Sequence, residues 1–348
     1  MGIYSSQQGV ALYFPGGIKM QKFKVKSLCV ALALLGLQAA TAQDYIVPRT
    51  EYGHPDLQGV WTNASQTPLE RPRDMGEQRA FTPEQAREIE QGWLDYMAAR
   101  QAPSDPNRPP PTDTNVDLGY DNFWVDMGTD VIKIGDEYRT SILIQPANGR
   151  VAYKEGVRPN FFGRRPEGLG PYDGPEARPL GERCLMSFGS SGGPPMLPVM
   201  YNNNYQIVQT ADHVVILVEM VHDARIIKLS GRHDAHNMQE WMGDSIGYYE
   251  GNTLVVKTRN INEQQTFRGS TPDMVVTEYF TRVAADKIEY RFELDDANVF
   301  AEPLIGEVAM YMRPEGEPMY EYACHEGNHA LAGILAGARV QEQEASSR

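Results

Sequence analysis

A succession of short apolar segments separated by tight turns constrains the fold of this chain most strongly. Residues 205–323 contain YQIVQT, HVVILVEMV, ARIIKLS, IGYYEG, NTLVVKTRNI, MVVTEYFTRV, KIEYRFELDD, EVAMYMR and MYEYAC. Turn-like joints such as TAD, EGN and AADK are typical of antiparallel meanders. Alternation in MVVTEYFTRV indicates one buried face and one wet or cavity-lining face. Closure removes open sheet edges. We therefore predict a mainly β protein built on an antiparallel up-and-down barrel.

The N-terminus has the pattern of a secretory signal peptide over residues 1–42. Met20 precedes the basic QKFKVK, the apolar LCVALALLGLQAA and an Ala-Thr-Ala site, which predicts cleavage before Gln43 and an upstream extension over residues 1–19. The apolar run is too short to span a membrane. We expect a periplasmic or secreted mature chain with no membrane association.

The mature chain is expected to consist of an N-terminal arm and helix (residues 43–112) and a barrel domain (residues 113–340). In FTPEQAREIEQGWLDYMAARQ, Thr82 and Gln85 form a capping box and Pro83 suits the first turn. One apolar stripe follows along this helix: Ile89, Trp93 and Met97. A Gly- and Pro-rich stretch, residues 158–198, predicts a long ordered loop over one barrel end. A short helix is expected near the C-terminus.

The charge of the chain narrows the choice of partners. The formal net charge of −14 becomes −18 when the four lysines of residues 1–42 are removed. Such an acidic surface repels phosphate backbones and anionic lipid heads. We therefore expect a small-molecule ligand or substrate, and neither a nucleic acid nor a membrane.

Two cysteines remain after cleavage, Cys184 and Cys324. In an oxidising compartment they most simply form a disulfide. It would close a loop of about 140 residues and stabilise the fold by roughly 4–5 kcal/mol. The alternative, a catalytic thiol, requires a reduced thiolate, and export argues against it.

Several segments resemble those of a family of exported, uncharacterised bacterial proteins. They are YNNNYQIVQTADHVVILVEMVHDARII, GDSIGYYEGNTLVVKT, FRGS, EYACHEGNHAL, PDLQGVWTN and TPLERP. They span nearly the whole mature chain, and the resemblance implies export but no activity. More loosely, the YYEGNTLVV and TEYFTRVAADKIEY hairpins resemble lipocalin-like barrels. That resemblance implies a barrel holding one small ligand, although fold alone does not imply function.

The stretch HDARIIKLSGRHDAH (residues 222–236) concentrates the candidate chemistry. His222 and Asp223 at a strand junction could act as general base and acid in a cavity. The alternative is that His222 bonds to backbone and Asp223 pairs with Arg225 on the outer face. His233 and His236, with Asp234 between them, could bind a divalent metal such as zinc, or form a solvated loop.

His325 and Glu326 follow Cys324 at the start of the last helix. A disulfide would place this imidazole and carboxylate rigidly, as acid–base chemistry requires. The alternative is that Glu326 and Asn328 cap the helix.

Polar and aromatic side chains around the strands are candidates for substrate binding. They are Tyr205, Arg225, Trp241 and Tyr249. The amides of YNNNY suit hydrogen bonds to sugar hydroxyls or a carbonyl, but Asn runs also make turns. Four aromatic residues have two interpretations, as an aromatic wall of a binding site or as part of the hydrophobic core. They are Trp124, Trp241, Tyr248 and Tyr249.

Two functions follow from these candidates. The first is an exported enzyme that uses His, Asp and Glu acid–base chemistry on a small organic substrate in a barrel pocket, as a lyase, isomerase or hydrolase. Its proton-transfer residues would be His222, His325 and Glu326. The second is a non-catalytic, lipocalin-like protein that binds a small hydrophobic or aromatic molecule.

Overall fold

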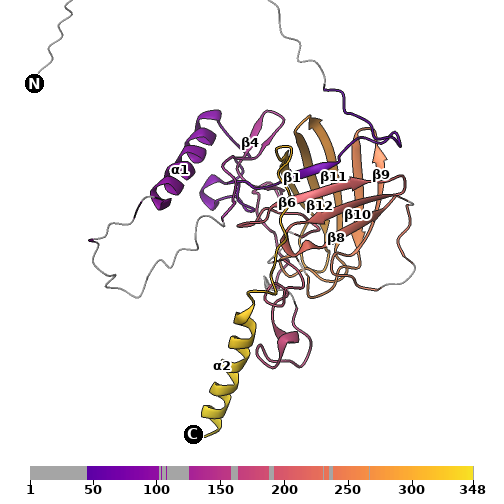
Figure 1. The fold of residues 1–348 in the computed structure, drawn as a ribbon. Coiled ribbons are helices and arrows are strands. Elements are labelled where there is room, and N and C mark those ends of the chain that lie inside the picture. Colours follow the sequence, from indigo (N-terminus) through magenta and orange to yellow (C-terminus); the bar gives the residue numbers. More distant parts are fainter. Residues whose placement is uncertain are drawn as a thin grey trace, which may run out of the picture. The chain divides into compact units, whose positions relative to one another are not determined.

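Figure 1 shows the computed structural model, in which a barrel forms the main body of the described chain. The structure describes residues 45–101, 103, 107, 125–157, 164–187, 192–229, 231–234, 238–265 and 267–347. The predicted signal peptide, Trp124 and His236 lie outside these residues. The barrel strands are β1 (Gly59–Thr62), β6 (Asn204–Gln209), β7 (His213–Val218), β8 (Ala224–Lys228), β9 (Asp244–Glu250), β10 (Thr253–Arg259), β11 (Val275–Ala284), β12 (Lys287–Asp295) and β13 (Leu304–Met312).

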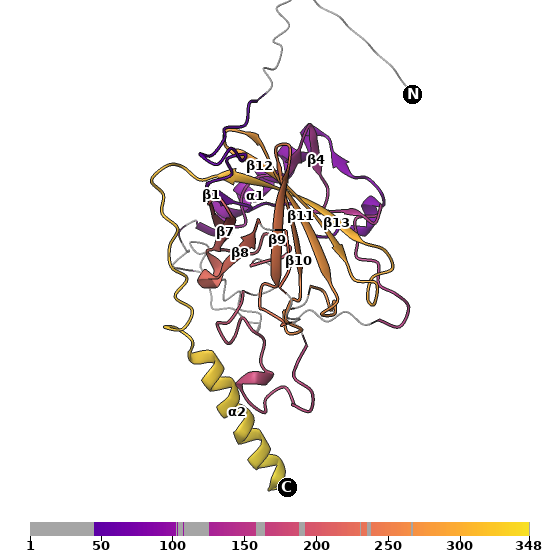
Figure 2. The ribbon, with the colours of Figure 1, turned by 90° about the vertical axis from the view of Figure 1, so that its right-hand side faces the viewer.

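These nine strands close on themselves in the order β1-β6-β7-β8-β9-β10-β11-β12-β13. Pairing of Trp61 with Met312 and of Thr62 with Tyr311 completes the ring. Figure 2 shows β9 to β13 side by side. The predicted mainly β barrel is confirmed. One pair, β8 and β9, is parallel, because the long connection over residues 229–243 returns the chain to the same end before β9 begins.

The remaining elements lie outside the ring. Strand β5 (Leu143–Gln145) extends the sheet beyond β13, and β2 (Ala80–Phe81), β4 (Glu137–Arg139) and β3 (Lys133–Ile134) form a small separate sheet. The helices are α1 (Pro83–Gln101) and α2 (His329–Ser346), with short 3₁₀ turns η1 (Arg73–Met75), η3 (Pro175–Ala177) and η4 (Met220–His222). Among the described helices, none combines the length and apolarity required to cross a membrane.

Helix α1 begins where the sequence predicts. The Thr82 backbone N–H donates to Gln85 Oε1 at 2.9 Å, and the Gln85 N–H donates to Thr82 Oγ1 at 3.2 Å. This reciprocal pair is the predicted capping box. The predicted apolar stripe is half-buried, and Ala86 is the one fully buried residue of the helix.

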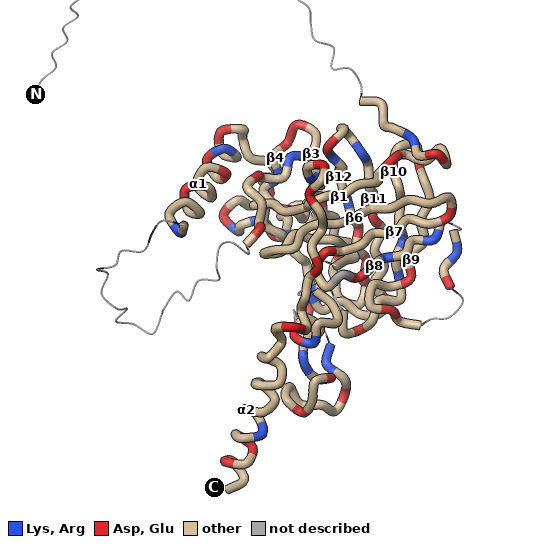
Figure 3. Tube along the Cα trace, viewed as in Figure 1, with Lys and Arg blue, Asp and Glu red and all other residues tan. Residues whose placement is uncertain are grey.

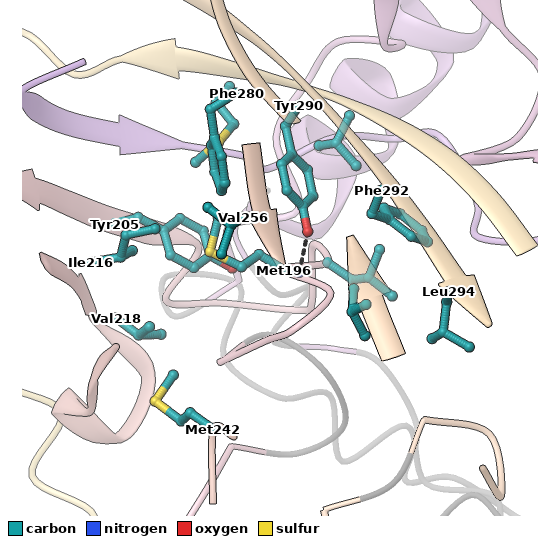
Figure 4. Close-up of a cluster of buried hydrophobic side chains, with 14 of the residues drawn as sticks. Met196, Tyr205, Ile216, Val218, Met242, Val256, Phe280, Tyr290, Phe292 and Leu294 are labelled. Carbon is teal, nitrogen blue, oxygen red and sulfur yellow. Dashed lines mark hydrogen bonds between the residues drawn. The ribbon is translucent and has the colours of Figure 1, made fainter. Parts of the chain in front are cut away.

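The interior of the barrel is filled by side chains. Along β11 and β12, buried and half-buried residues alternate, so every second side chain points inward. The largest inward aromatic side chains, each at most 1% exposed, are Trp61, Tyr205, Phe280, Tyr290 and Phe292. Figure 4 shows part of this packing. The barrel therefore has a solid core along most of its length.

The predicted disulfide joins Cys184 to Cys324, with 5.7 Å between their Cα atoms. A catalytic thiol at either position is therefore excluded in this structure. The bond ties the Gly- and Pro-rich loop to the segment before α2. Asn328 strengthens the same junction, since its Nδ2 donates to the Glu182 carbonyl at 2.7 Å.

Candidate functional site

A buried ion pair lies inside the barrel. Arg225 of β8 and Glu278 of β11 occupy inward positions and are 2% and 0% exposed. Arg225 Nη1 lies 3.0 Å from Glu278 Oε1, and Nη2 lies 2.5 Å from Oε2. Burial alone lowers the pKa of Arg225, but the Glu278 carboxylate offsets this and raises that pKa above its ordinary value. The guanidinium therefore stays charged.

The Gly- and Pro-rich loop enters the same interior. Tyr290 donates its hydroxyl to Glu278 Oε1 at 2.8 Å and accepts from the Met196 backbone N–H at 3.0 Å (Figure 4). The Met196 carbonyl accepts from Asn63 Nδ2 at 3.4 Å, and the same nitrogen lies 3.2 Å from the Tyr205 hydroxyl. Burial raises the pKa of both tyrosines, so both remain protonated.

We call these groups the interior polar cluster. Its members are Arg225, Glu278, Tyr290, Tyr205, Asn63 and the peptide of Met196. All are 2% exposed or less. Within the described structure, Arg225 Nε and Asn63 Oδ1 have no hydrogen-bond partner. The low exposure of its members means that the cluster is closed to solvent. The Met196 peptide bridges Tyr290 and Asn63, so the cluster holds this end of the loop inside the barrel.

A pocket of about 590 Å³ lies beside this loop. We call it the loop-end pocket. Most of its described lining residues are apolar, and several belong to the barrel core. The lining residues are Ser65, Gln66, Thr67, Pro68, Leu69, Met127, Ile142, Leu197, Pro198, Val199, Met200, Phe267 and Arg268. Pockets of this volume with mainly apolar walls hold drug-sized organic molecules.

The polar groups of the loop-end pocket hold its walls in place. Ser65 Oγ donates to the Asp130 carbonyl at 2.9 Å, and Thr67 Oγ1 accepts from the Ile132 N–H at 2.8 Å. Gln66 Nε2 donates to a neighbouring carbonyl at 2.7 Å. Among the described lining residues, Arg268 is the one that carries a charge. The pocket therefore offers apolar contact area with one cationic group.

The histidine-rich stretch forms a cluster of its own. His233 Nδ1 lies 3.0 Å from Asp244 Oδ2, and Lys228 Nζ lies 2.9 Å from Asp244 Oδ1 and 2.8 Å from Asp234 Oδ2. Burial raises the pKa of Asp244, but the Lys228 contact and the Asp234 backbone N–H outweigh it, and the pKa falls below its ordinary value. Asp244 is therefore a carboxylate that fixes the orientation of the His233 imidazole.

Metal binding by His233 and His236 stays a prediction, because His236 lies outside the described residues. In the part of the chain that the structure describes, no group of three or more His, Cys, Asp or Glu side chains is arranged to hold a metal ion. His233 instead contacts Asp244, eleven residues further along the chain.

The strand junction before β8 is strained. Val221 has φ 67° and ψ 12°, a left-handed conformation that β-branched residues rarely adopt and that is often found near functional sites. The backbone of His222 lies in the same turn, but its side chain is outside the described structure. Asp223 follows, half-buried. Nearby Glu219 is 5% exposed, and burial raises its pKa although Asn204 donates to it at 2.6 Å.

The expected alternative of an outer-face ion pair between Asp223 and Arg225 is wrong. Arg225 points into the barrel because β8 begins at Ala224 with an exposed residue and then alternates. Its carboxylate partner, Glu278, comes from β11, 53 residues further along the chain.

His325 and Glu326 are both exposed, on the segment between the disulfide and α2. Asn328 caps that helix, since its Oδ1 accepts from the Leu331 N–H at 3.4 Å. The structure places neither His325 nor Glu326 among the described lining residues of the loop-end pocket. Their proposed catalytic role stays a prediction.

Of the predicted substrate-binding residues, Tyr205 and Arg225 both belong to the interior polar cluster. Tyr249 lies near the β9–β10 turn, where its hydroxyl accepts from Gln209 Nε2 at 2.8 Å and its ring stacks on His54 at 4.3 Å. Trp241 is half-buried against the core. The structure therefore brings two of the four together and places the other two elsewhere.

The partners in these clusters were not predicted from the sequence. Glu278 gave a signal, because a carboxylate stood on the apolar face of an alternating strand. Tyr290 stood on the equivalent face of the next strand. Asp244 and Asn63 gave no comparable signal, since each lies at a strand end in a polar context.

Comparison of this chain with protein-family models, with curated proteins and with solved structures finds no match. The geometry of the loop-end pocket and of the two clusters is therefore the basis for assigning a function.

Proposed function

We propose that this chain is an exported protein that binds a small, mainly apolar organic molecule in the loop-end pocket. The observation that carries this proposal is a pocket of about 590 Å³ with apolar walls and one arginine, Arg268. Apolar walls supply most of the binding free energy, and a few polar groups orient the ligand. The matching ligand has an apolar or aromatic body and a polar or acidic end.

Binding fits this pocket better than catalysis does. Its described lining residues include no His, Asp or Glu, so they supply no acid–base pair for proton transfer. The hydroxyls of Ser65 and Thr67 already bond to backbone groups of residues 130 and 132. Export is supported by the disulfide, since such bonds persist in oxidising compartments.

The test uses 8-anilinonaphthalene-1-sulfonate, which has an aromatic body and an acidic end. We expect saturable fluorescence enhancement with one site in the loop-end pocket. Met200 lines that pocket and is 48% exposed, so Met200→Trp fills the mouth without disturbing the core. Met238, 65% exposed and outside the described lining, provides the matched control Met238→Trp. We expect Met200→Trp to weaken binding on the order of tenfold and Met238→Trp to leave it unchanged. Equal affinity in both variants would refute the assignment.

A second candidate function, an acid–base enzyme, is favoured by the His233–Asp244 contact. A buried carboxylate bound to Nδ1 leaves Nε2 of the imidazole as a general base, as in hydrolytic triads. Incubation with a mixture of small organic metabolites, followed by mass spectrometry, tests for turnover. Loss of turnover in His233→Gln, with stability retained, would support this candidate. Turnover lost instead in His222→Ala or His325→Ala would move the site to the residues that the sequence indicated.

A further inference from the structure

A second pocket, of about 560 Å³, borders two consecutive arginines. We call it the arginine pocket. Arg164 and Arg165 line it together with Val157, Thr271, Asn298 and Val299. The same two arginines also line a neighbouring pocket of about 370 Å³. Two cationic side chains therefore stand between two hollows in the surface.

The side chains of these arginines have no partner among the described residues, whereas most other described arginines hydrogen-bond or form an ion pair through their side chains. Neither Arg164 nor Arg165 forms an ion pair with any described residue, and both are exposed. By contrast, Arg178 in the same loop pairs with Glu182 through two contacts of 2.8 and 2.9 Å. The formal net charge is −14, and acidic and basic residues are interspersed over the barrel (Figure 3). Two adjacent cations without a side-chain partner among the described residues therefore face the arginine pocket.

Two acidic residues beside the arginine pocket, Asp296 and Asp273, already accept hydrogen bonds. Asp296 is 2% exposed and accepts from the backbone N–H groups of Thr271 and Asn298 at 2.5 and 3.0 Å. Asp273 accepts from Asn298 Nδ2 at 2.9 Å. The described lining itself contains no carboxylate. These contacts bond the carboxylates of Asp296 and Asp273 to groups of the wall.

We propose that the arginine pocket binds the carboxylate of a small organic acid. Guanidinium groups bind carboxylates through paired, charge-assisted hydrogen bonds. The Thr271 hydroxyl is a further donor, and Val157 and Val299 give the pocket an apolar side for the body of the ligand. A volume of about 560 Å³ exceeds the need of a single inorganic anion. The described linings of this site and of the loop-end pocket have no residue in common.

Isothermal titration with benzoate tests this proposal, with benzamide as the uncharged analogue. The variant is Arg164→Gln/Arg165→Gln. The control is Arg73→Gln/Arg232→Gln, which removes the same charge from two exposed arginines that also lack a partner among the described residues. We expect benzoate affinity to fall on the order of tenfold in the variant and to stay unchanged in the control. Benzamide should not bind, and raising the salt concentration should weaken benzoate binding.

Equal benzoate affinity in the variant and the control would overturn the proposal. Competition by inorganic phosphate as effective as that by benzoate would overturn the organic-acid assignment in favour of a free anion. Titration of the same variant with 8-anilinonaphthalene-1-sulfonate reports on the loop-end pocket separately. Unchanged dye binding together with lost benzoate binding supports two independent sites.

Discussion

Removal of Glu278 is expected to destabilise the barrel far more than removal of an exposed carboxylate. In Glu278→Ala, the Arg225 guanidinium stays buried but loses two hydrogen bonds of 3.0 and 2.5 Å. Tyr290 loses the acceptor that lies 2.8 Å from its hydroxyl. An uncompensated buried charge of this kind costs about 3–5 kcal/mol of the free energy of unfolding. For a chain of this size, the corresponding fall in Tm is on the order of 10 °C.

The matched control is Glu293→Ala on the neighbouring strand. Glu293 and Arg291 form an ion pair at 2.7 Å, but their side chains are 38% and 36% exposed. Solvent screening limits the contribution of such a pair to about 0–1 kcal/mol. Urea unfolding under non-reducing conditions, followed by far-UV circular dichroism, compares the two variants directly.

A double-mutant cycle isolates the buried pair. The double variant Arg225→Met/Glu278→Leu leaves no buried charge without a partner. It is therefore expected to lower the free energy of unfolding by less than Arg225→Met or Glu278→Leu alone. If Glu278→Ala costs no more than Glu293→Ala, Arg225 is solvated in the folded state and the pair does not contribute as a buried ion pair. Additive single costs would equally contradict a coupled pair.

Three further outcomes are expected. Burial raises the pKa of Glu219 above its ordinary value of 4.5. Protonated Glu219 therefore stabilises the fold at a pH below 4.5, and this contribution is lost as the pH rises through the raised pKa. Glu219→Gln should therefore increase the free energy of unfolding at neutral pH but not in acid, and a pH series of urea melts giving equal effects would contradict this. A Cβ at Gly306 would overlap the Phe292 ring, so Gly306→Ala should cost about 1–3 kcal/mol by the same assay, and Phe292→Leu should recover part of it. The Cys184–Cys324 disulfide closes a loop with a sequence separation of 140 residues, so its reduction should lower the free energy of unfolding by roughly 4–5 kcal/mol. An unchanged Tm on adding reductant would refute this prediction.

Local features of the structure were predictable because local sequence determines them. The Thr82–Gln85 capping box requires residues three positions apart. Alternation along β11 depends on neighbouring residues alone. The disulfide was predictable because two cysteines, Cys184 and Cys324, lie outside the predicted signal peptide.

Partners across the barrel were not predictable in the same way. Arg225 and Glu278 each stand at an inward position, but which strands face one another depends on closure of the whole ring. The parallel β8–β9 pair follows from the path of a connection whose residues have no periodic pattern. Met196 lies between prolines in a Gly- and Pro-rich stretch, and such a stretch predicts a loop on the surface. Its burial became favourable only because the barrel interior offered Tyr290 and Asn63 as hydrogen-bond partners.

The two ends of the barrel differ in the length of the connections between strands. At one end, tight turns join β6 to β7, β9 to β10 and β11 to β12, and the N-terminal segment seals the opening. There the Leu57 N–H donates to Gln209 Oε1 at 2.6 Å, and Arg282 Nη1 donates to the Asp56 carbonyl at 2.9 Å. The opposite end carries the long connections and the disulfide-tied loop, and these segments line both proposed pockets. Short turns with bonded backbones leave little room for a ligand, whereas long loops on a rigid scaffold supply varied side chains. We therefore place both proposed sites at the loop-bearing end, where Tyr290, itself bonded to Glu278, anchors the Met196 backbone inside the barrel.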